Sequence, residues 1–446
     1  MQNNFLTKAK NFIHNKDLLT LWMNNFLVAY AFFLPVSPSF RSTLFVDMFL
    51  LFLLRGNIKE NLKTAWKNPI VRSFVYLFGI YVTGLLWTEN LKHGLWAVKS
   101  IKYGLYLIIF YAIVDGRYIQ KVLSTFILGM LFSELISYSM LLGILPWALD
   151  IEGVRVYTAY AVGDPSPFLH HIHYGVALAF VVLLLAQKII YSHTSQWMKI
   201  FMSLFVLTAT ANIFVTGGRT GYLTFIALLL ILAFSYLRRY IIPLLIAIPL
   251  LFGIAYNISP IFKDKVIQTQ KNITSLVSHK PDLNTSIGQR AAIYYYGFKV
   301  FQEHPLLGVG SGDSMDEIKK HTPKQYTNIQ QMPHEHNQFL STLLSLGIVG
   351  LIIFLNVYYQ IFRYKQEDKE LRFIMIFSTL AISFGILTTQ FNLRFFMPLW
   401  VVMLAISMIS KNRRTFDSEI NDKTVFLQVS AIIIAISAIR FFKHFI

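Results

Sequence analysis

Residues His173–Tyr191 read HYGVALAFVVLLLAQKIIY, an apolar run with a single lysine near its end. Its length matches the roughly 20 residues that an α-helix needs to cross the hydrocarbon core of a bilayer. Backbone N–H and C=O groups inside lipid must be satisfied within the segment itself, so we expect a helix here. The stretch therefore predicts a membrane span.

Similar apolar runs recur along the chain. The sequence is 55% hydrophobic and only 14% charged, with a mean hydropathy of +0.53, which leaves too little polar surface for a soluble domain of 446 residues. We predict an all-α polytopic membrane protein with about twelve transmembrane helices, to which Thr424–Phe442 would add a thirteenth. The twelve expected spans are Leu18–Val36, Ser42–Leu54, Ile70–Trp87, Leu95–Val114, Ile119–Leu145, His173–Tyr191, Met198–Thr216, Thr220–Leu237, Tyr240–Asn257, Gln338–Phe362, Phe373–Thr389 and Phe395–Ser410.

The net charge of +18 suggests nucleic acid at first sight. However, the basic residues lie in short loops between apolar runs, where membrane proteins keep them for orientation. The chain has no cysteine, which excludes disulfides and thiolate metal sites. Met1–Asp17 is polar and basic, and a full span follows it, so we expect an uncleaved anchor and no cleavable signal peptide.

Loop charge also predicts sidedness. With a cytoplasmic N-terminus, every strongly basic short loop falls on the cytoplasmic side. Three segments then face the periplasm: Pro146–Ile172, the turn Gly217–Arg219, and Ile258–Asn337. We therefore divide the chain into spans one to nine (1–257), one large, partly helical periplasmic loop (258–337), and the remaining spans (338–446).

The large loop contains a predicted helix. Ser286–Gln289 resembles a capping box with Ser286 as the N-cap, Pro305 ends the helix, and Leu306–Gly312 follows as a tight turn. Spacings of three and four residues predict an apolar face that lies on the membrane domain. The residues of this face are Ile287, Ala291, Tyr294, Phe298 and Phe301.

Two arginines on the periplasmic side are candidates for anion binding. Arg290 lies in the first turn of the predicted helix, where a cation adds to the positive end of the helix dipole and favours an anion such as phosphate. Arg219 lies in Thr216–Gly221, TGGRTG, where glycines permit close approach of a ligand. The alternatives are a surface arginine paired with a carboxylate for Arg290, and a side chain that extends to lipid headgroups for Arg219.

His334–Asn337, HEHN, directly precedes the tenth span. A histidine here could act as a general base at neutral pH. The alternatives are a histidine at the lipid interface and a metal site, for which the third ligand is missing. Weaker candidates on the same side are Arg155, His170, His171, His173 and Arg394, while Asp164–Pro167 has the composition of an ordinary turn.

Taken together, these motifs resemble the O-antigen ligase superfamily, which includes lipopolysaccharide O-antigen ligases, O-antigen polymerases and related oligosaccharide transferases. The matching stretches are Thr216–Gly221, Ser286–Gly312 and Pro333–Gly350. The expected topology, about twelve spans with one large late periplasmic loop, is similar as well and implies a GT-C-like fold. The resemblance is clearest between His173 and Trp400.

The resemblance implies an enzyme of the bacterial inner membrane whose active site faces the periplasm. It would transfer a glycan from undecaprenyl pyrophosphate to a sugar hydroxyl of lipid A-core with inversion, and without a metal or other cofactor. Arg219 and Arg290 would stabilise the departing pyrophosphate, and His336 would act as the base. Weaker substrate-binding candidates are His334, Asn337, Arg394 and Arg155.

Alternative functions remain at this level. An O-antigen polymerase or a protein O-oligosaccharyltransferase would use the same donor chemistry with another acceptor. A multi-span transporter or flippase is the alternative from a different class. Transporters place ionisable groups and broken helices near the middle of the membrane, whereas the notable residues here gather at one face.

Overall fold

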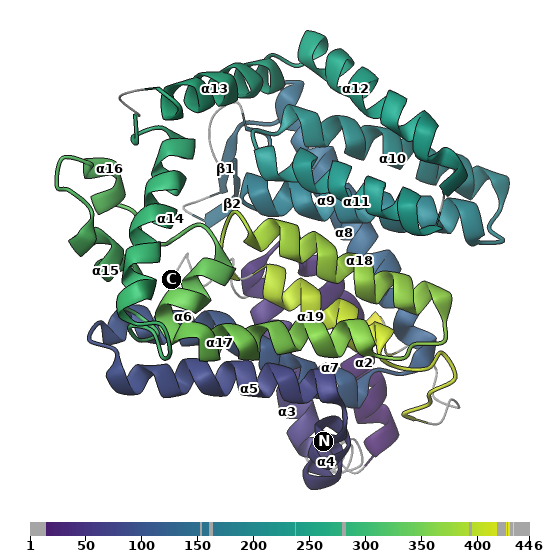
Figure 1. Cartoon of the computed structure of the whole chain (residues 1–446). Coiled ribbons are helices and arrows are strands. Elements are labelled where there is room, and N and C mark those ends of the chain that lie inside the picture. Colours follow the sequence, from purple (N-terminus) through teal and green to yellow (C-terminus); the bar gives the residue numbers. More distant parts are fainter. Residues whose placement is uncertain are drawn as a thin grey trace.

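We analysed a computed structural model of the chain. It describes residues 15–151, 154–159, 164–236, 238–278, 282–391, 395–416, 425, 427–428 and 431. Helices dominate these residues (Figure 1). The α-helices are α2 (Lys16–Phe33), α3 (Pro38–Arg55), α4 (Ile58–Lys67), α5 (Pro69–Thr83), α6 (Leu91–Ile101), α7 (Tyr106–Ile113), α8 (Ile119–Leu141), α9 (His171–Tyr191), α10 (Gln196–Val215), α11 (Arg219–Tyr236), α12 (Ile241–Ile258), α13 (Pro260–Leu276), α14 (Ser286–Glu303), α15 (Ser314–His321), α16 (Thr327–Gln330), α17 (Gln338–Arg363), α18 (Lys369–Ile386) and α19 (Phe396–Ser407).

Four short 3-10 segments and one hairpin complete the described elements. The 3-10 segments η1 (Gly84–Trp87), η2 (Lys102–Leu105), η3 (Gly116–Tyr118) and η4 (Arg238–Tyr240) extend or join neighbouring helices. Strands β1 (Ala148–Ile151) and β2 (Val154–Thr158) pair antiparallel. This hairpin lies within Pro146–Ile172, for which the sequence pattern predicted no strand.

Each of the twelve expected spans overlaps one or more of these helices. Eight helices of the described chain, counted with their 3-10 extensions, are long and apolar enough to cross a membrane, and α19 is a shorter apolar helix. The chain is thus a multi-pass membrane protein. The count of twelve stays a prediction, and the segment Thr424–Phe442 lies almost wholly outside the described residues.

Helix α12 illustrates why the surroundings must be lipid. The segment Arg238–Ile258 has a mean hydropathy of 2.2, yet only 6% of its apolar window is buried within the protein. A helix that is apolar on all sides and lacks protein neighbours would be unstable in water, because a large apolar surface would stay hydrated. In a bilayer the same surface is solvated by acyl chains.

The helices of the large loop gather at one end of the membrane helices. Figure 1 shows α13 to α16 together at one side of the molecule. Helix α14 packs on α13, α15, α16 and the start of α17. Their shared core is small and contains Ala292, Ile293, Val300, Met315, Ile318, Ile329 and Leu344.

Helix α14 forms as predicted, but its cap and its buried face differ. Thr285, not Ser286, is the N-cap, and its hydroxyl accepts from the Gly288 N–H at 3.0 Å. The amide of Gln289 donates to the Asn284 carbonyl at 2.9 Å and so does not complete a capping box. Arg290 is therefore the fifth helical residue and lies beyond the first turn.

The buried face of α14 is also rotated from the predicted one. Gly288, Ala292, Ile293, Gly297 and Val300 are buried. In contrast, Tyr294 and Phe298 are 43% and 58% exposed. The prediction weighted large apolar side chains, whereas close packing against α17 requires small ones, so Gly297 lies against Leu344.

A break in α17 lets backbone hydrogen bonds join this helix to the large loop. Gly347 has φ +63° inside the helix, a conformation that a residue with a Cβ rarely adopts. The free backbone groups around it bond to the segment after α14: the Val309 N–H donates to the Leu344 carbonyl at 3.0 Å, and the Ile348 N–H donates to the Pro305 carbonyl at 2.9 Å. The predicted turn Leu306–Gly312 thus fills the gap in α17.

Candidate active site

Arg219 is the first residue of α11 and joins three helices. Its Nη1 donates to Thr269 Oγ1 of α13 at 3.1 Å, and its Nη2 donates to Ser286 Oγ of α14 at 2.5 Å. The side chain is half-buried. It therefore turns inward to the loop helices and does not extend to lipid headgroups.

Arg290 lies one turn along α14 from Ser286, the residue whose hydroxyl accepts from Arg219. It is half-buried, and burial together with the positive charge of Arg219 lowers the pKa of its guanidinium. Neither arginine forms an ion pair with a carboxylate of the described residues. The two guanidinium groups thus form a site of surplus positive charge, which an anion would stabilise.

The HEHN segment forms a tight turn before α17. The His336 N–H donates to His334 Nδ1 at 3.3 Å, and the ring centroids are 4.2 Å apart. His336 has φ +55°, a left-handed conformation that is uncommon for a residue with a Cβ. Such backbone strain is often found at functional sites.

Two neighbours of His336 have structural roles. Glu335 is 3% exposed and accepts from Ser314 Oγ and from Gln390 Nε2, so it anchors the turn. Asn337 caps α17, since its Oδ1 accepts from the Phe339 and Leu340 N–H groups at 2.8 and 3.1 Å. Its Nδ2 donates to the Tyr294 hydroxyl at 2.9 Å, so its polar atoms already have partners.

Burial and nearby cations keep both histidines of the turn unprotonated. Burial and Arg290 lower the pKa of His334 to about 4. Burial, His334, Arg290 and His170 lower the pKa of His336 to about 3. At neutral pH both rings are neutral and each has one nitrogen that can accept a proton. They remain weak bases unless an anion offsets the positive charge of Arg290.

The N-terminus of α9 brings a third group of residues to this site. His171 Nδ1 lies 3.0 Å from Asp164 Oδ2, and the ring of His170 lies 4.1 Å from that of His171. Burial is the main cause that lowers the pKa of His170 to about 3, and the nearby charges include His171, Asp164 and His334. His170, the N-cap of α9, therefore lies within electrostatic reach of His334 in the turn before α17.

Asp164 and His171 also explain the glycines before Arg219. A Cβ on Gly217 would lie 3.2 Å from Asp164 Oδ2, and one on Gly218 would lie 2.9 Å from the His171 carbonyl oxygen. The turn before Arg219 thus packs against this pair. Sequence reasoning treated Asp164 as part of an ordinary turn, and only its proximity to three histidines could have indicated more.

Of the remaining candidates, Arg155 lies on β2, where its Cα pairs with that of Asp150. Arg394 and the side chain of Arg155 are outside the described residues. His173 is buried inside α9, with its ring 4.3 Å from that of Phe396. In the part of the chain that the structure describes, no group of three or more His, Asp or Glu side chains is arranged to hold a metal ion.

Residues 203–355 match the model of a protein family described as O-antigen ligase. The resemblance to the O-antigen ligase superfamily is confirmed. The match spans about a third of the chain (153 of 446 residues), from α10 into α17, and includes Arg219, Arg290 and His336. Members of this family are glycosyltransferase-like enzymes, which implies a glycan-linked donor and a lipid acceptor in general terms. No curated protein matches the chain.

Proposed function

We propose that the chain is an O-antigen ligase that transfers a glycan from undecaprenyl pyrophosphate to a sugar hydroxyl of lipid A-core at the periplasmic face. The observation that supports this most is the pair Arg219 and Arg290, two half-buried cations that form no ion pair with a carboxylate of the described residues, near an unprotonated His336. A pyrophosphate is the chemical group that such a site would bind most strongly.

The reaction would be one in-line displacement. The acceptor hydroxyl oxygen attacks the anomeric carbon while the bond from that carbon to the phosphate oxygen breaks. Undecaprenyl pyrophosphate leaves with the bonding electron pair, and the hydroxyl proton passes to His336. The anomeric configuration inverts because the two bonds lie on opposite faces of the sugar.

Each residue would have a distinct role. Arg219 and Arg290 stabilise the charge that develops on the leaving group, a contribution of about 3–4 kcal/mol for one removed donor in comparable sites. Bound pyrophosphate also offsets the cations around His336, which raises the pKa of that ring and makes it a better base in the complex than in the free protein. His334 holds the His336 backbone, and Asp164 with His171 supports the turn before Arg219.

An O-antigen polymerase is the second candidate. The segment Pro146–Ile172 includes His170 and His171 near its end, so a second expected periplasmic segment would contribute to the site. Such an arrangement would suit a growing chain on a lipid carrier as the acceptor.

A deletion strain separates the two activities. Without a ligase, electrophoresis of lipopolysaccharide would show bare core and glycan retained on the carrier lipid. Without a polymerase, the core would carry a single repeat. We expect the deletion strain to show bare core. The wild-type gene should restore glycan on the core, and the R290A gene should not. A single-repeat pattern would favour the polymerase activity over the ligase activity, and an unchanged pattern would contradict both proposed activities.

A further inference from the structure

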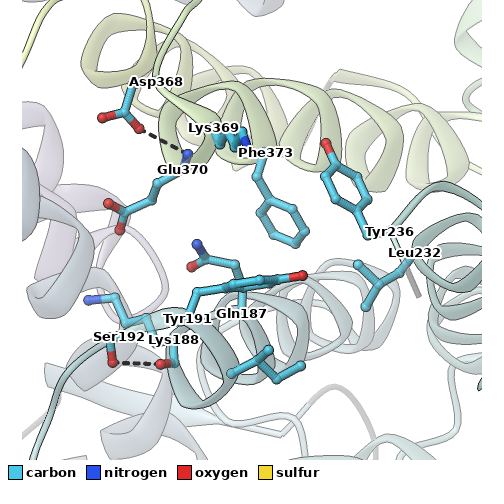
Figure 2. Close-up of a pocket in the computed structure, with 11 residues that line it drawn as sticks. Gln187, Lys188, Tyr191, Ser192, Leu232, Tyr236, Asp368, Lys369, Glu370 and Phe373 are labelled. Atoms are coloured by element: carbon cyan, nitrogen blue, oxygen red, sulfur yellow. Dashed lines mark hydrogen bonds between the residues drawn. The ribbon is translucent and has the colours of Figure 1, made fainter.

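A cavity of about 610 Å³ lies at the other end of the helices that build the site (Figure 2). Helix α9 begins at His171 beside Asp164 and ends at Tyr191, which lines the cavity. Its 21 residues make it about 30 Å long, since an α-helix rises about 1.5 Å per residue. The cavity and the candidate active site therefore lie near opposite surfaces of the membrane.

Three membrane helices form the cavity. They are α9, α11 and α18, which pack on one another. The apolar part of the wall comes from Ile190, Tyr191, Leu232, Tyr236 and Phe373. Figure 2 shows the rings of Tyr191 and Phe373 in the space between α9 and α18. This wall offers an acyl chain an apolar surface between the helices.

The rim of the cavity is charged. Lys188 and Lys369 line it together with Asp368 and Glu370. Lys411 bridges both carboxylates, with its Nζ 2.8 Å from Asp368 Oδ2 and 2.7 Å from Glu370 Oε2. The two acids thus already share a cation.

The two lysines that line the cavity have weaker partners. Lys188 Nζ donates to Gln120 Oε1 at 3.1 Å, and this neutral amide in turn donates to Glu370 Oε1 at 2.8 Å. Lys369 is exposed and forms no ion pair with another described residue. Three ammonium groups against two carboxylates leave a net charge of +1 at the rim.

We propose that this cavity binds an anionic glycerophospholipid of the leaflet opposite the active site, with its phosphate on Lys188 and Lys369 and an acyl chain on the apolar wall. A zwitterionic headgroup fits less well, because its ammonium would add positive charge where the carboxylates already share Lys411. The lipid would connect α9, α11 and α18, and at the opposite ends of the first two helices lie His171 and Arg219. This inference does not depend on the proposed function.

Native mass spectrometry of the purified protein tests the headgroup. The protein is equilibrated in bilayer discs of equal parts phosphatidylglycerol and phosphatidylethanolamine and then released with its retained lipids. We expect several-fold more phosphatidylglycerol than phosphatidylethanolamine on the wild type. The preference should disappear in the K188A/K369A variant and persist in K365A, a lysine on the same connection but outside the cavity. Equal retention of both lipids by the wild type would overturn the proposal.

Two further measurements keep the result interpretable. Phosphatidylglycerol should raise the Tm of the wild type and of K365A but not that of K369Q, which changes one exposed side chain and should fold normally. An I190W variant places a large ring in the apolar wall from a position that is 51% exposed, and it should retain less phospholipid of either kind. Unchanged retention by I190W would place the lipid elsewhere and overturn the site.

Discussion

The charged side chains at the two ends of helix α9 are paired differently. At the Lys188 end, Lys411 bridges Asp368 and Glu370, and the amide of Gln120 links Lys188 to Glu370. At the His171 end, the charge of Arg219 acts on Arg290, and the acceptors of Arg219 among the described residues are the hydroxyl groups of Thr269 and Ser286. The paired carboxylates stabilise the folded state and leave a net charge of only +1 at the Lys188 end, whereas neither arginine at the His171 end is paired with a carboxylate of the described residues. This difference is why we place the proposed active site at the His171 end, and the predictions below test that placement.

The largest expected loss of activity is at His336. Replacement by Asn removes the imidazole but keeps a residue that tolerates φ +55°, so the turn should persist. Loss of a general base lowers a rate by about 10²–10⁴-fold. We expect a fall of this size in glycan transfer to core, measured with purified donor and acceptor. H304N, a histidine change on the exposed end of α14, is the control and should leave transfer unchanged. Near-normal transfer by H336N would rule out the base role.

The arginine pair should give the next largest effect. R219A or R290A should each lower transfer by about 10²–10³-fold, as loss of one charge-stabilising donor does elsewhere. The Tm of R290A should not fall, because the substitution relieves repulsion between two half-buried cations. K299A, on an exposed position of α14, should keep normal transfer. A marked drop in Tm for R290A would show that Arg290 is structural instead.

A smaller effect is expected at Asp164. The D164N change removes the negative charge that faces His171 while it preserves shape. Loss of this ion-pair contact should displace the turn before Arg219 and lower transfer by about tenfold, which corresponds to about 1.4 kcal/mol. The apparent affinity for donor should weaken more than kcat, because Arg219 would bind it less well. D264N, an exposed residue of α13, serves as the control. If kcat alone changed, a direct role in chemistry would replace this one.

The pH dependence should show only a small change. A general base acts when unprotonated, and the pKa of His336 is lowered to about 3, so the acid limb of kcat/KM should move to lower pH. Between pH 7.5 and 5.5 we expect a change of no more than about twofold. An unperturbed histidine with a pKa of about 6.5 would lose about tenfold over the same range. A tenfold loss that H334N shifts would instead indicate that the turn is more solvated than the structure shows.

The smallest effect on activity is expected at the Lys188 end of α9. K411A leaves Asp368 and Glu370 without their shared cation, so it should lower stability by about 1 kcal/mol or less, as expected for partly exposed ion pairs. Transfer should stay normal because the active site is about a helix length away. The sharpest test of the comparison is the contrast with R290A, which should lose transfer activity but keep its stability. A large loss of transfer in K411A would show that the two ends are coupled.

Much of the fold could be predicted because membrane helices leave a strong local pattern. The runs such as His173–Tyr191 became helices at the expected places, and Pro305 directly follows α14 and its C-cap. The order of Arg219, Arg290 and His336 was enough for the resemblance that the family match confirmed. Each of these signals lies within a few residues or within one span.

The rest could not be predicted because it depends on contacts between distant segments. The buried face of α14 was misjudged since Gly297 packs on Leu344 of another helix, and the break at Gly347 is stabilised by Leu306–Gly312. Asp164 gained significance only when His171 and Gly217 came beside it. The cap at Thr285 was missed by one residue, because adjacent Thr and Ser are equivalent as caps until the backbone is known.

By itself, the sequence determined that this chain lies in a membrane and which three residues are the leading candidates, because hydrophobic length and short motifs are local properties. Only the tertiary structure decided that Arg219 donates to Ser286 on the helix that carries Arg290, and that neither arginine forms an ion pair with a carboxylate of the described residues. It also decided that His336 is neutral and strained, and that Lys411 bridges Asp368 and Glu370 near the far end of α9. The physical reason is that electrostatics and burial depend on distances in space. For residues far apart in sequence, these distances are fixed only when the helices pack.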